Sequence, residues 1–213
     1  TFNNVALGAQ HLLAAHGLAR VLVVDVDAHH GNGTQSAFYD RADVLYVSIH
    51  REHAYPFTGA ATETGEGAGE GFTVNVPIDR RVGDLEYATL LRHLLWPLAR
   101  AYRPEFVLVS CGFDLHRSDP IGELSLTEEG YRWIADLLVR LAVEFSGGRT
   151  AWVLEGGYSV AGIKAAGRRV LRRLAGLDPL TAADLARLDR ARLDRVPGIR
   201  KVLAAHGERW GVA

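Results

Sequence analysis

The chain has 213 residues, of which 48% are hydrophobic, and a formal net charge of −1, as is typical of one globular domain with a substantial core. The balanced charge excludes the concentrated basic face of a nucleic-acid-binding protein. No apolar run approaches the roughly 18 residues of a membrane span, and no signal peptide is recognisable, so we expect a cytoplasmic protein. The single cysteine, Cys111, excludes an internal disulfide and a cysteine-rich metal cluster, so a metal would need histidine and carboxylate ligands.

Helical and strand patterns alternate along the chain. Apolar spacing predicts a helix over residues 3–19, and the continuous apolar run 20–26 predicts a strand that is buried on both faces. A short helix near 33–39 and strands over 44–49 and 72–78 are predicted next. This alternation is typical of a sheet covered by helices.

The same alternation continues to about residue 175. The predicted elements are an amphipathic helix over 84–102 with a kink at Pro97, a strand over 106–111, a helix from a Ser125–Glu128 capping box to about 145, a buried strand over 150–155 and a helix over 160–175.

These elements predict a three-layer α/β/α fold around a mainly parallel sheet. Residues 176–213, which are rich in Leu, Ala, Arg and Asp, are expected to form surface helices in a C-terminal tail. No stretch has the composition of a linker, so we predict one domain over 1–213.

Polar residues follow three of the predicted strands. Asp27 and His29 come directly after the first strand, Asp114 follows strand 106–111, and Tyr158 follows strand 150–155. The carboxyl ends of parallel strands share one edge of a sheet, where ligands bind, so we expect these side chains to meet there. Two carboxylates and an imidazole can hold Zn²⁺ with an open coordination position, and a tyrosine facing the metal can stabilise a developing oxyanion. The pattern therefore predicts a metal-dependent hydrolase that acts on an amide.

The stretches DVDAHHGNGTQSAFY, GFDLHRSDPIGELSLT and LEGGY resemble the motifs of the zinc-dependent histone deacetylase superfamily, in the branch of bacterial class II-like deacetylases and acetylpolyamine amidohydrolases. The resemblance extends to about residue 175. It implies the arginase/deacetylase-like fold, a zinc-dependent removal of acetyl groups from acetyl-lysine or acetylated polyamines, and a bound K⁺. From charge and hydropathy we expect no nucleic-acid or membrane partner, and a homo-oligomer is a candidate assembly.

The resemblance also implies roles for individual residues. Asp27, His29 and Asp114 would be the zinc ligands, and Tyr158 would be the catalytic oxyanion donor. A structural K⁺ would be bound by Asp25, Ser48 and Ile49, a second cation by the carbonyl of Phe38, and the substrate tunnel would be lined by Tyr55, Ile121, Gly156 and Gly157.

The family's general base and acid are a histidine pair upstream of a segment that ends in Phe-Asn-Asn, and this chain starts at TFNN. The resemblance therefore places the pair, and one tunnel aromatic, before Thr1; neither His30 nor His116 matches the pair. If the natural protein lacks the pair, the alternative is a non-catalytic scaffold that binds acyl-lysine or zinc. A binuclear manganese hydrolase of the arginase type is a second alternative, although its second metal would need aspartates where this chain has Gly31 and His116.

Overall fold

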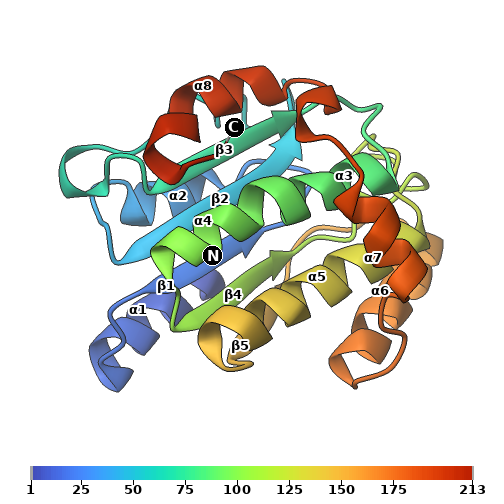
Figure 1. Ribbon diagram of the computed structural model, residues 1–213, viewed down its shortest axis with the longest axis horizontal. Coiled ribbons are helices and arrows are strands. Elements are labelled where there is room, and N and C mark those ends of the chain that lie inside the picture. Colours follow the sequence, from blue (N-terminus) through green and yellow to red (C-terminus); the bar gives the residue numbers. More distant parts are fainter. Residues whose placement is uncertain (1, 213) are drawn as a thin grey trace.

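A five-stranded sheet, in which every neighbouring pair of strands is parallel, forms the centre of the molecule (Figure 1). The computed structural model describes residues 2–212. The strand order is β3-β2-β1-β4-β5, which confirms the predicted parallel sheet. The strands are β1 (Val21–Asp25), β2 (Val44–Arg51), β3 (Thr73–Ile78), β4 (Phe106–Cys111) and β5 (Thr150–Leu154).

Helices cover both faces of the sheet and confirm the three-layer architecture. Helices α1 and α2 lie on one face, and α3, α4 and α5 lie on the other, with α6 packed along α5 (Figure 1). The helices are α1 (Asn4–His16), α2 (Asn32–Phe38), α3 (Asp84–Leu90), α4 (Trp96–Tyr102), α5 (Glu128–Ser146), α6 (Val160–Leu174), α7 (Ala182–Asp189) and α8 (Ile199–Trp210). None of them is both long and apolar enough to cross a bilayer.

The continuous apolar run of β1 is explained by burial on both faces. Leu22 and Val24 enter the large hydrophobic cluster beneath α3 to α5, whereas Val21 and Val23 enter a smaller cluster with Val5 of α1. Successive side chains of a strand point to opposite faces, so a strand between two helical layers needs apolar residues at every position. The core therefore fixes β1 and leaves only its carboxyl end free for polar chemistry.

Two predicted helices end or change form earlier than expected. The first helix ends at His16, because Gly17 adopts φ 65° and its N–H donates to the carbonyl of Leu12. The predicted helix 84–102 is divided by a π-helical segment, Leu91–Leu95, and α4 then begins with Pro97 at one of its first two helical positions, where its missing N–H costs least. The kink predicted at Pro97 is thus replaced by a π-helical segment that lies directly before α4.

The predicted capping box at Ser125 is wrong. Thr127 caps α5 instead, and its hydroxyl accepts a hydrogen bond from the backbone N–H of Glu129 at 3.1 Å. Ser125 donates its hydroxyl to the carbonyl of Arg80. Ser125 lies three residues before Glu128 and Thr127 lies directly before it, and tertiary contacts decide which of them begins the helix.

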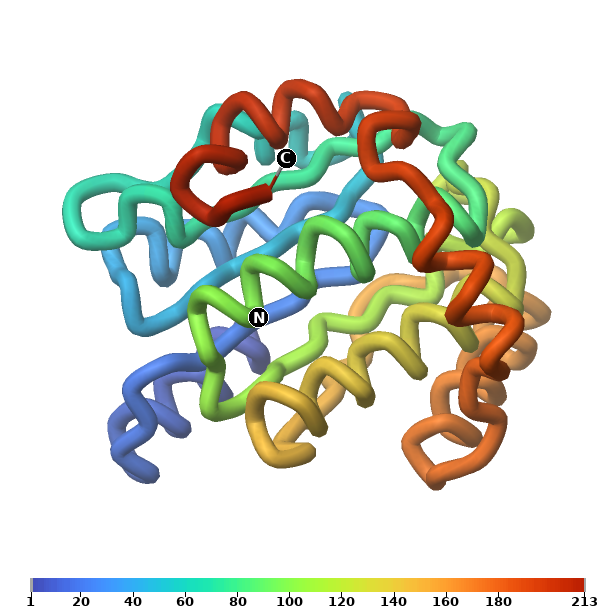
Figure 2. Tube along the Cα trace, in the orientation of Figure 1, coloured from blue at the N-terminus to red at the C-terminus, as the bar shows by residue number. Residues whose placement is uncertain are grey.

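One prediction of burial is also wrong. Strand β5 was expected to be buried, but it lies at the edge of the sheet, and Leu154 is 68% exposed. The tail forms helices α7 and α8, most of whose residues are exposed or half-buried, and Leu188 of α7 and Val202 of α8 are fully buried in the large hydrophobic cluster. Figure 2 shows the tail in orange-red to red, with α8 running beside β3, which it contacts. The tail therefore contributes to the core that supports the sheet.

Helix α8 carries a buried histidine that should make the fold sensitive to acid. His206 is 1% exposed, and neither of its ring nitrogens has a hydrogen-bond partner among the described residues. Burial, and secondarily Arg209, lowers the pKa of His206 from 6.5 to about 4. As the pH falls, His206 is therefore protonated in the unfolded chain before it is protonated in the folded protein. The contribution of neutral His206 to the free energy of unfolding is complete above pH 6.5 and is lost as the pH falls towards 4.

We expect the free energy of unfolding to fall between about pH 7 and about pH 5, with His206 accounting for on the order of 1–2 kcal/mol. In His206→Leu this fall should be smaller by that amount, as measured by urea unfolding at each pH. His11→Leu, which replaces an exposed histidine on α1, is the control and should keep the wild-type dependence. An identical acid loss in wild type and His206→Leu would contradict the assignment.

Candidate metal centre

The parallel pairing of β1 with β4 brings the predicted ligands together. Asp25 at the end of β1 pairs in register with Ser110 near the end of β4. Asp27 and His29 lie shortly after the end of β1, and Asp114 lies shortly after the end of β4. All three are therefore at neighbouring positions of the same edge of the sheet. One potential ligand atom from each of the three side chains lies within 4.8 Å of the others. We refer to Asp27, His29 and Asp114 as the triad.

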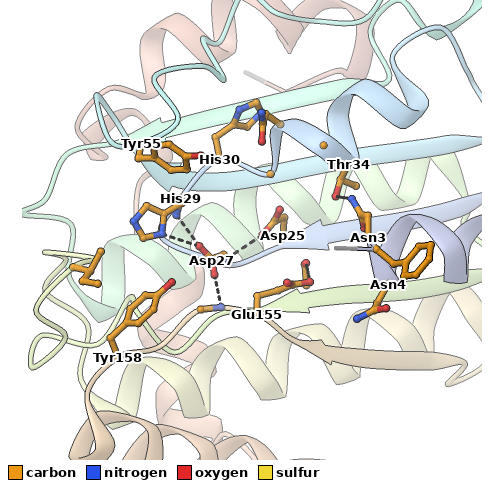
Figure 3. Close-up of a pocket in the computed structure, with 17 residues that line it drawn as sticks. Asn3, Asn4, Asp25, Asp27, His29, His30, Thr34, Tyr55, Glu155 and Tyr158 are labelled. Atoms are coloured by element: carbon orange, nitrogen blue, oxygen red, sulfur yellow. Dashed lines mark hydrogen bonds and ion pairs between the residues drawn. The ribbon is translucent and has the colours of Figure 1, made fainter.

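The triad is oriented by hydrogen bonds, of which Figure 3 shows those that Asp27 makes. The Nδ1 atom of His29 lies 3.1 Å from Oδ1 of Asp27 and 3.0 Å from Oδ2 of Asp114. The remaining carboxylate oxygens accept backbone N–H groups, from Gly156 to Asp27 at 2.8 Å and from Ala28 to Asp114 at 3.0 Å. These donors hold both carboxylates in place and leave an oxygen of each facing the imidazole.

The electrostatics of the triad favour a cation at its centre. Hydrogen bonds to Asp114 and then to Asp27 raise the pKa of His29 to about 10. Burial raises the pKa of Asp114, whereas the pKa of Asp27 is lowered because hydrogen bonds from His29 and Gly156 outweigh its burial. Two carboxylates in a partly buried site thus stabilise positive charge between them.

The space around the triad is suited to a compact metal site. A Cβ atom added to Gly112 would lie 2.4 Å from Oδ2 of Asp27, and one added to Gly156 would lie 2.5 Å from Oδ2 of Asp114. Glycine therefore lets the backbone approach the carboxylates from two sides. One imidazole nitrogen and two carboxylate oxygens form a donor set that fits Zn²⁺ with an open position. Within residues 2–212, the triad is the only group of three or more such ligands.

Gly156→Ala is expected to lower the affinity of the triad for Zn²⁺ by about 10-fold or more, because the new methyl group displaces carboxylate oxygens of Asp27 and Asp114. The measurement is a competition titration against a zinc chelator. Gly8→Ala on α1 is the matched control, since its Cβ would meet Leu108 at an ordinary 3.7 Å. Equal affinities of the two variants would contradict the role of Gly156.

The triad opens into a cavity of about 720 Å³. Asp27 and His29 line it together with Tyr158, Tyr55 and Ile121. In Figure 3, Tyr158 points towards Asp27, and Tyr55 lies on the other side of His29. Burial, with the charges of Asp114 and Asp27, raises the pKa of Tyr158, so its hydroxyl remains a hydrogen-bond donor.

The two predicted tunnel glycines differ. Gly156 lines the cavity, whereas Gly157 is absent from its lining and has Phe113 and Ile163 as its nearest neighbours. Gly157 adopts φ 139°, a conformation that side-chain-bearing residues rarely adopt. Gly157 is therefore required for the path of the backbone, and its role as a tunnel residue stays a prediction.

The residues predicted to bind monovalent cations occupy two places. Asp25 and Ser48 are buried and pair in register on β1 and β2, and the carboxylate of Asp25 accepts the hydroxyl of Tyr46 at 2.9 Å. Burial is the main reason that the pKa of Asp25 is raised. Ile49 follows Ser48 with its side chain in the core, and Phe38 lies at the end of α2, where its carbonyl accepts the N–H of Arg41. The potassium sites stay predictions.

Sequence reasoning missed Glu155. This residue lines the cavity and accepts the hydroxyl of Ser110 at 2.6 Å. Its position directly after β5 is equivalent to that of the polar residues after β1, and this was the available signal.

Fold and site together define an α/β protein with one candidate metal centre at the carboxyl edge of a parallel sheet. Residues 1–174 match the family model described as "Histone deacetylase domain". The chain is 39% identical over 181 residues to histone deacetylase 14, chloroplastic, of Arabidopsis thaliana, covering 85% of this chain and 43% of that protein. It is 48% identical over 163 residues to the human polyamine deacetylase HDAC10, covering 74% of this chain and 24% of that protein.

A crystal structure of the HDA15 HD domain superposes with a TM-score of 0.81 at 39% identity, covering 99% of this chain and 56% of that one. The chain therefore belongs to the histone deacetylase family, and the predicted resemblance is confirmed. It spans less than half the length of the two curated relatives.

Proposed function

We propose that this domain binds one Zn²⁺ ion through Asp27, His29 and Asp114 and hydrolyses N-acetyl amides of the acetyl-lysine or acetylpolyamine class. The observation that carries the proposal is the triad at the carboxyl edge of the sheet, two members of which, Asp27 and His29, line one cavity together with Tyr158. Membership of the deacetylase family supports the reaction class, and the similarity to a polyamine deacetylase supports including polyamines among the substrates.

In the proposed reaction, the metal and individual residues have separate roles. When bound, Zn²⁺ supplies Lewis acidity for an amide carbonyl and favours the ionised form of water. Tyr158 donates its hydroxyl to the carbonyl oxygen, which gains negative charge as the carbon is attacked. Tyr55 and Ile121, which are 71% and 48% exposed, present apolar surface for the aliphatic part of the substrate.

The resemblance implies a histidine pair as the general base, and two histidines of the described residues, His30 and His116, lie near the triad. Both ring nitrogens of His30 are engaged, with the hydroxyl of Thr58 at 2.7 Å and with Gln35 at 2.9 Å. Nδ1 of His116 contacts the hydroxyl of Ser118 at 2.8 Å. Both nitrogens of His30 are thus engaged, and His116 does not line the cavity, so neither histidine is proposed as the base. This fits the prediction of an upstream histidine pair.

The binuclear manganese alternative is less well supported. No second group of three metal ligands accompanies the triad within residues 2–212, and Gly31 and His116 provide no carboxylates there. The scaffold alternative shares the same triad, so it is an outcome of the experiment below. The substrate, a homo-oligomer and a cytoplasmic location stay predictions.

The experiment measures metal content and turnover of the natural polypeptide. Purified protein is analysed for zinc and manganese, and is then assayed for acetate release from an acetyl-lysine peptide and from N-acetylspermidine. One zinc per chain with release from either substrate is the expected result. Zinc without turnover of either substrate would favour the scaffold, and two manganese ions per chain would favour the arginase-type alternative.

A further inference from the structure

Asp119 joins two loops at the edge of the candidate site. Its carboxylate is buried, with 6% of the residue exposed. Oδ1 accepts the backbone N–H groups of Ile121 at 2.9 Å and Gly122 at 3.0 Å. Oδ2 accepts those of Tyr158 at 2.6 Å and Ser159 at 3.2 Å. A buried carboxylate needs such donors, and here all four come from two segments that are distant in sequence.

Each of these segments supplies a wall of the cavity. Ile121 lines the cavity on one segment and Tyr158 lines it on the other. Tyr158 follows Gly156 and Gly157, and a glycine pair restricts the backbone little. The segment is therefore fixed by its hydrogen bonds, from Gly156 N–H to Asp27 at one end and from Tyr158 N–H to Asp119 at the other.

A second contact reinforces the same junction. The hydroxyls of Ser118 and Ser159 lie 2.9 Å apart, and Ser159 also caps α6 by accepting the N–H of Gly162 at 3.1 Å. The start of α6 is thus attached to the loop that carries Asp119. Any displacement of this loop would move Tyr158 relative to the triad.

We infer that Asp119 is a positioning residue, which fixes the Tyr158 hydroxyl and the Ile121 wall relative to Asp27, His29 and Asp114. This inference rests on the proposed function. Asp119 does not line the cavity and acts through Tyr158. In Asp119→Asn, the amide nitrogen cannot accept a hydrogen bond, so one of the two loops loses its acceptor.

The first test is a double-mutant cycle in the natural polypeptide, with kcat per bound zinc as the readout. Asp119→Asn is expected to lower kcat by about 10-fold or more, because a small displacement of a catalytic group is costly. Added to Tyr158→Phe, it should lower kcat by less than about 3-fold further, because the hydroxyl that it positions is already absent. Effects that multiply fully would overturn the inference, since that is the result of a general structural defect.

Asp84→Asn is the matched control. Asp84 also holds a chain segment by accepting the N–H of Thr127 at 2.8 Å and its hydroxyl at 2.6 Å, but it does not line the cavity. We expect kcat per bound zinc to stay within about 2-fold of wild type in this variant. A loss as large as that in Asp119→Asn would overturn a specific role for Asp119.

The second test is amide hydrogen exchange, which needs neither metal nor activity. In the wild-type protein, the amides of Tyr158 and Ser159 should be protected, and in Asp119→Asn they should exchange faster while the amides of β1 stay protected. Exchange in wild type at the rate of an unstructured peptide would overturn the inference, even if the variant fails to fold. If wild type shows this protection but hydrolyses no acetyl amide, the proposed function fails and the positioning geometry stands.

Discussion

His29→Ala is expected to lower the affinity for zinc by more than about 100-fold and to abolish measurable deacetylation. Loss of an outer partner of a metal ligand already costs about 10- to 100-fold, so loss of the ligand itself costs more. In this protein His29 is the only nitrogen donor of the triad, and its Nδ1 lies within 3.1 Å of both carboxylates. Without it, two carboxylates face each other with no imidazole between them, which disfavours their ionisation.

The measurement combines zinc titration with acetate release, and His16→Ala is the control. His16 is an exposed histidine in the last turn of α1, and its removal should leave both quantities unchanged. His29→Ala that still binds one zinc with wild-type affinity would show that the triad is not the metal site. Retained binding of zinc with lost turnover would instead separate the metal from the reaction.

The sequence predicted the position of the triad because two independent rules converge on the same residues. Burial on both faces requires β1 to be apolar from Val21 to Val24, so the first polar residues after it must lie at the sheet edge. The parallel order then places the residues after β4 beside those after β1. Neither rule depends on details of packing, and both apply to any strand of this kind.

Predictions that depended on tertiary packing were less accurate. The sequence of β5 is as apolar as that of β1, yet Leu154 is exposed because β5 has a neighbour on one side only. The frequent polar residues of the tail indicate surface helices, but they do not show that Val202 and Leu188 are covered by the rest of the core. Strand order and the docking of helices are properties of the whole chain, so local patterns do not contain them.

The hydrogen bonds of Asp119 were equally inaccessible from the sequence. An aspartate before a proline, Asp119, indicates a local turn or a group that orients a ligand, and the bonds to Ile121 and Gly122 are of the local kind. The bonds to Tyr158 and Ser159 cross 39 and 40 residues, and they require the loops after β4 and β5 to be neighbours. The function of a local motif is therefore set here by the sheet order.

Tyr158→Phe is expected to lower kcat by about 100-fold or more while the zinc content stays at the wild-type level, because removal of one oxyanion donor typically costs that much. The hydroxyl is the only atom removed, and no hydrogen bond from it to a triad member is present that would couple it to metal binding. The raised pKa of Tyr158 keeps this donor protonated, so the loss should be similar across neutral and mildly alkaline pH.

The control is Tyr39→Phe, which removes the hydroxyl of a tyrosine that follows α2 and does not line the cavity. Its kcat should equal that of wild type. If Tyr158→Phe keeps the wild-type kcat, Tyr158 is not the oxyanion donor, even if zinc is bound by the triad. If it loses zinc as well as activity, the hydroxyl supports the metal site, because an oxyanion donor acts only on the substrate and its removal leaves the ligands in place.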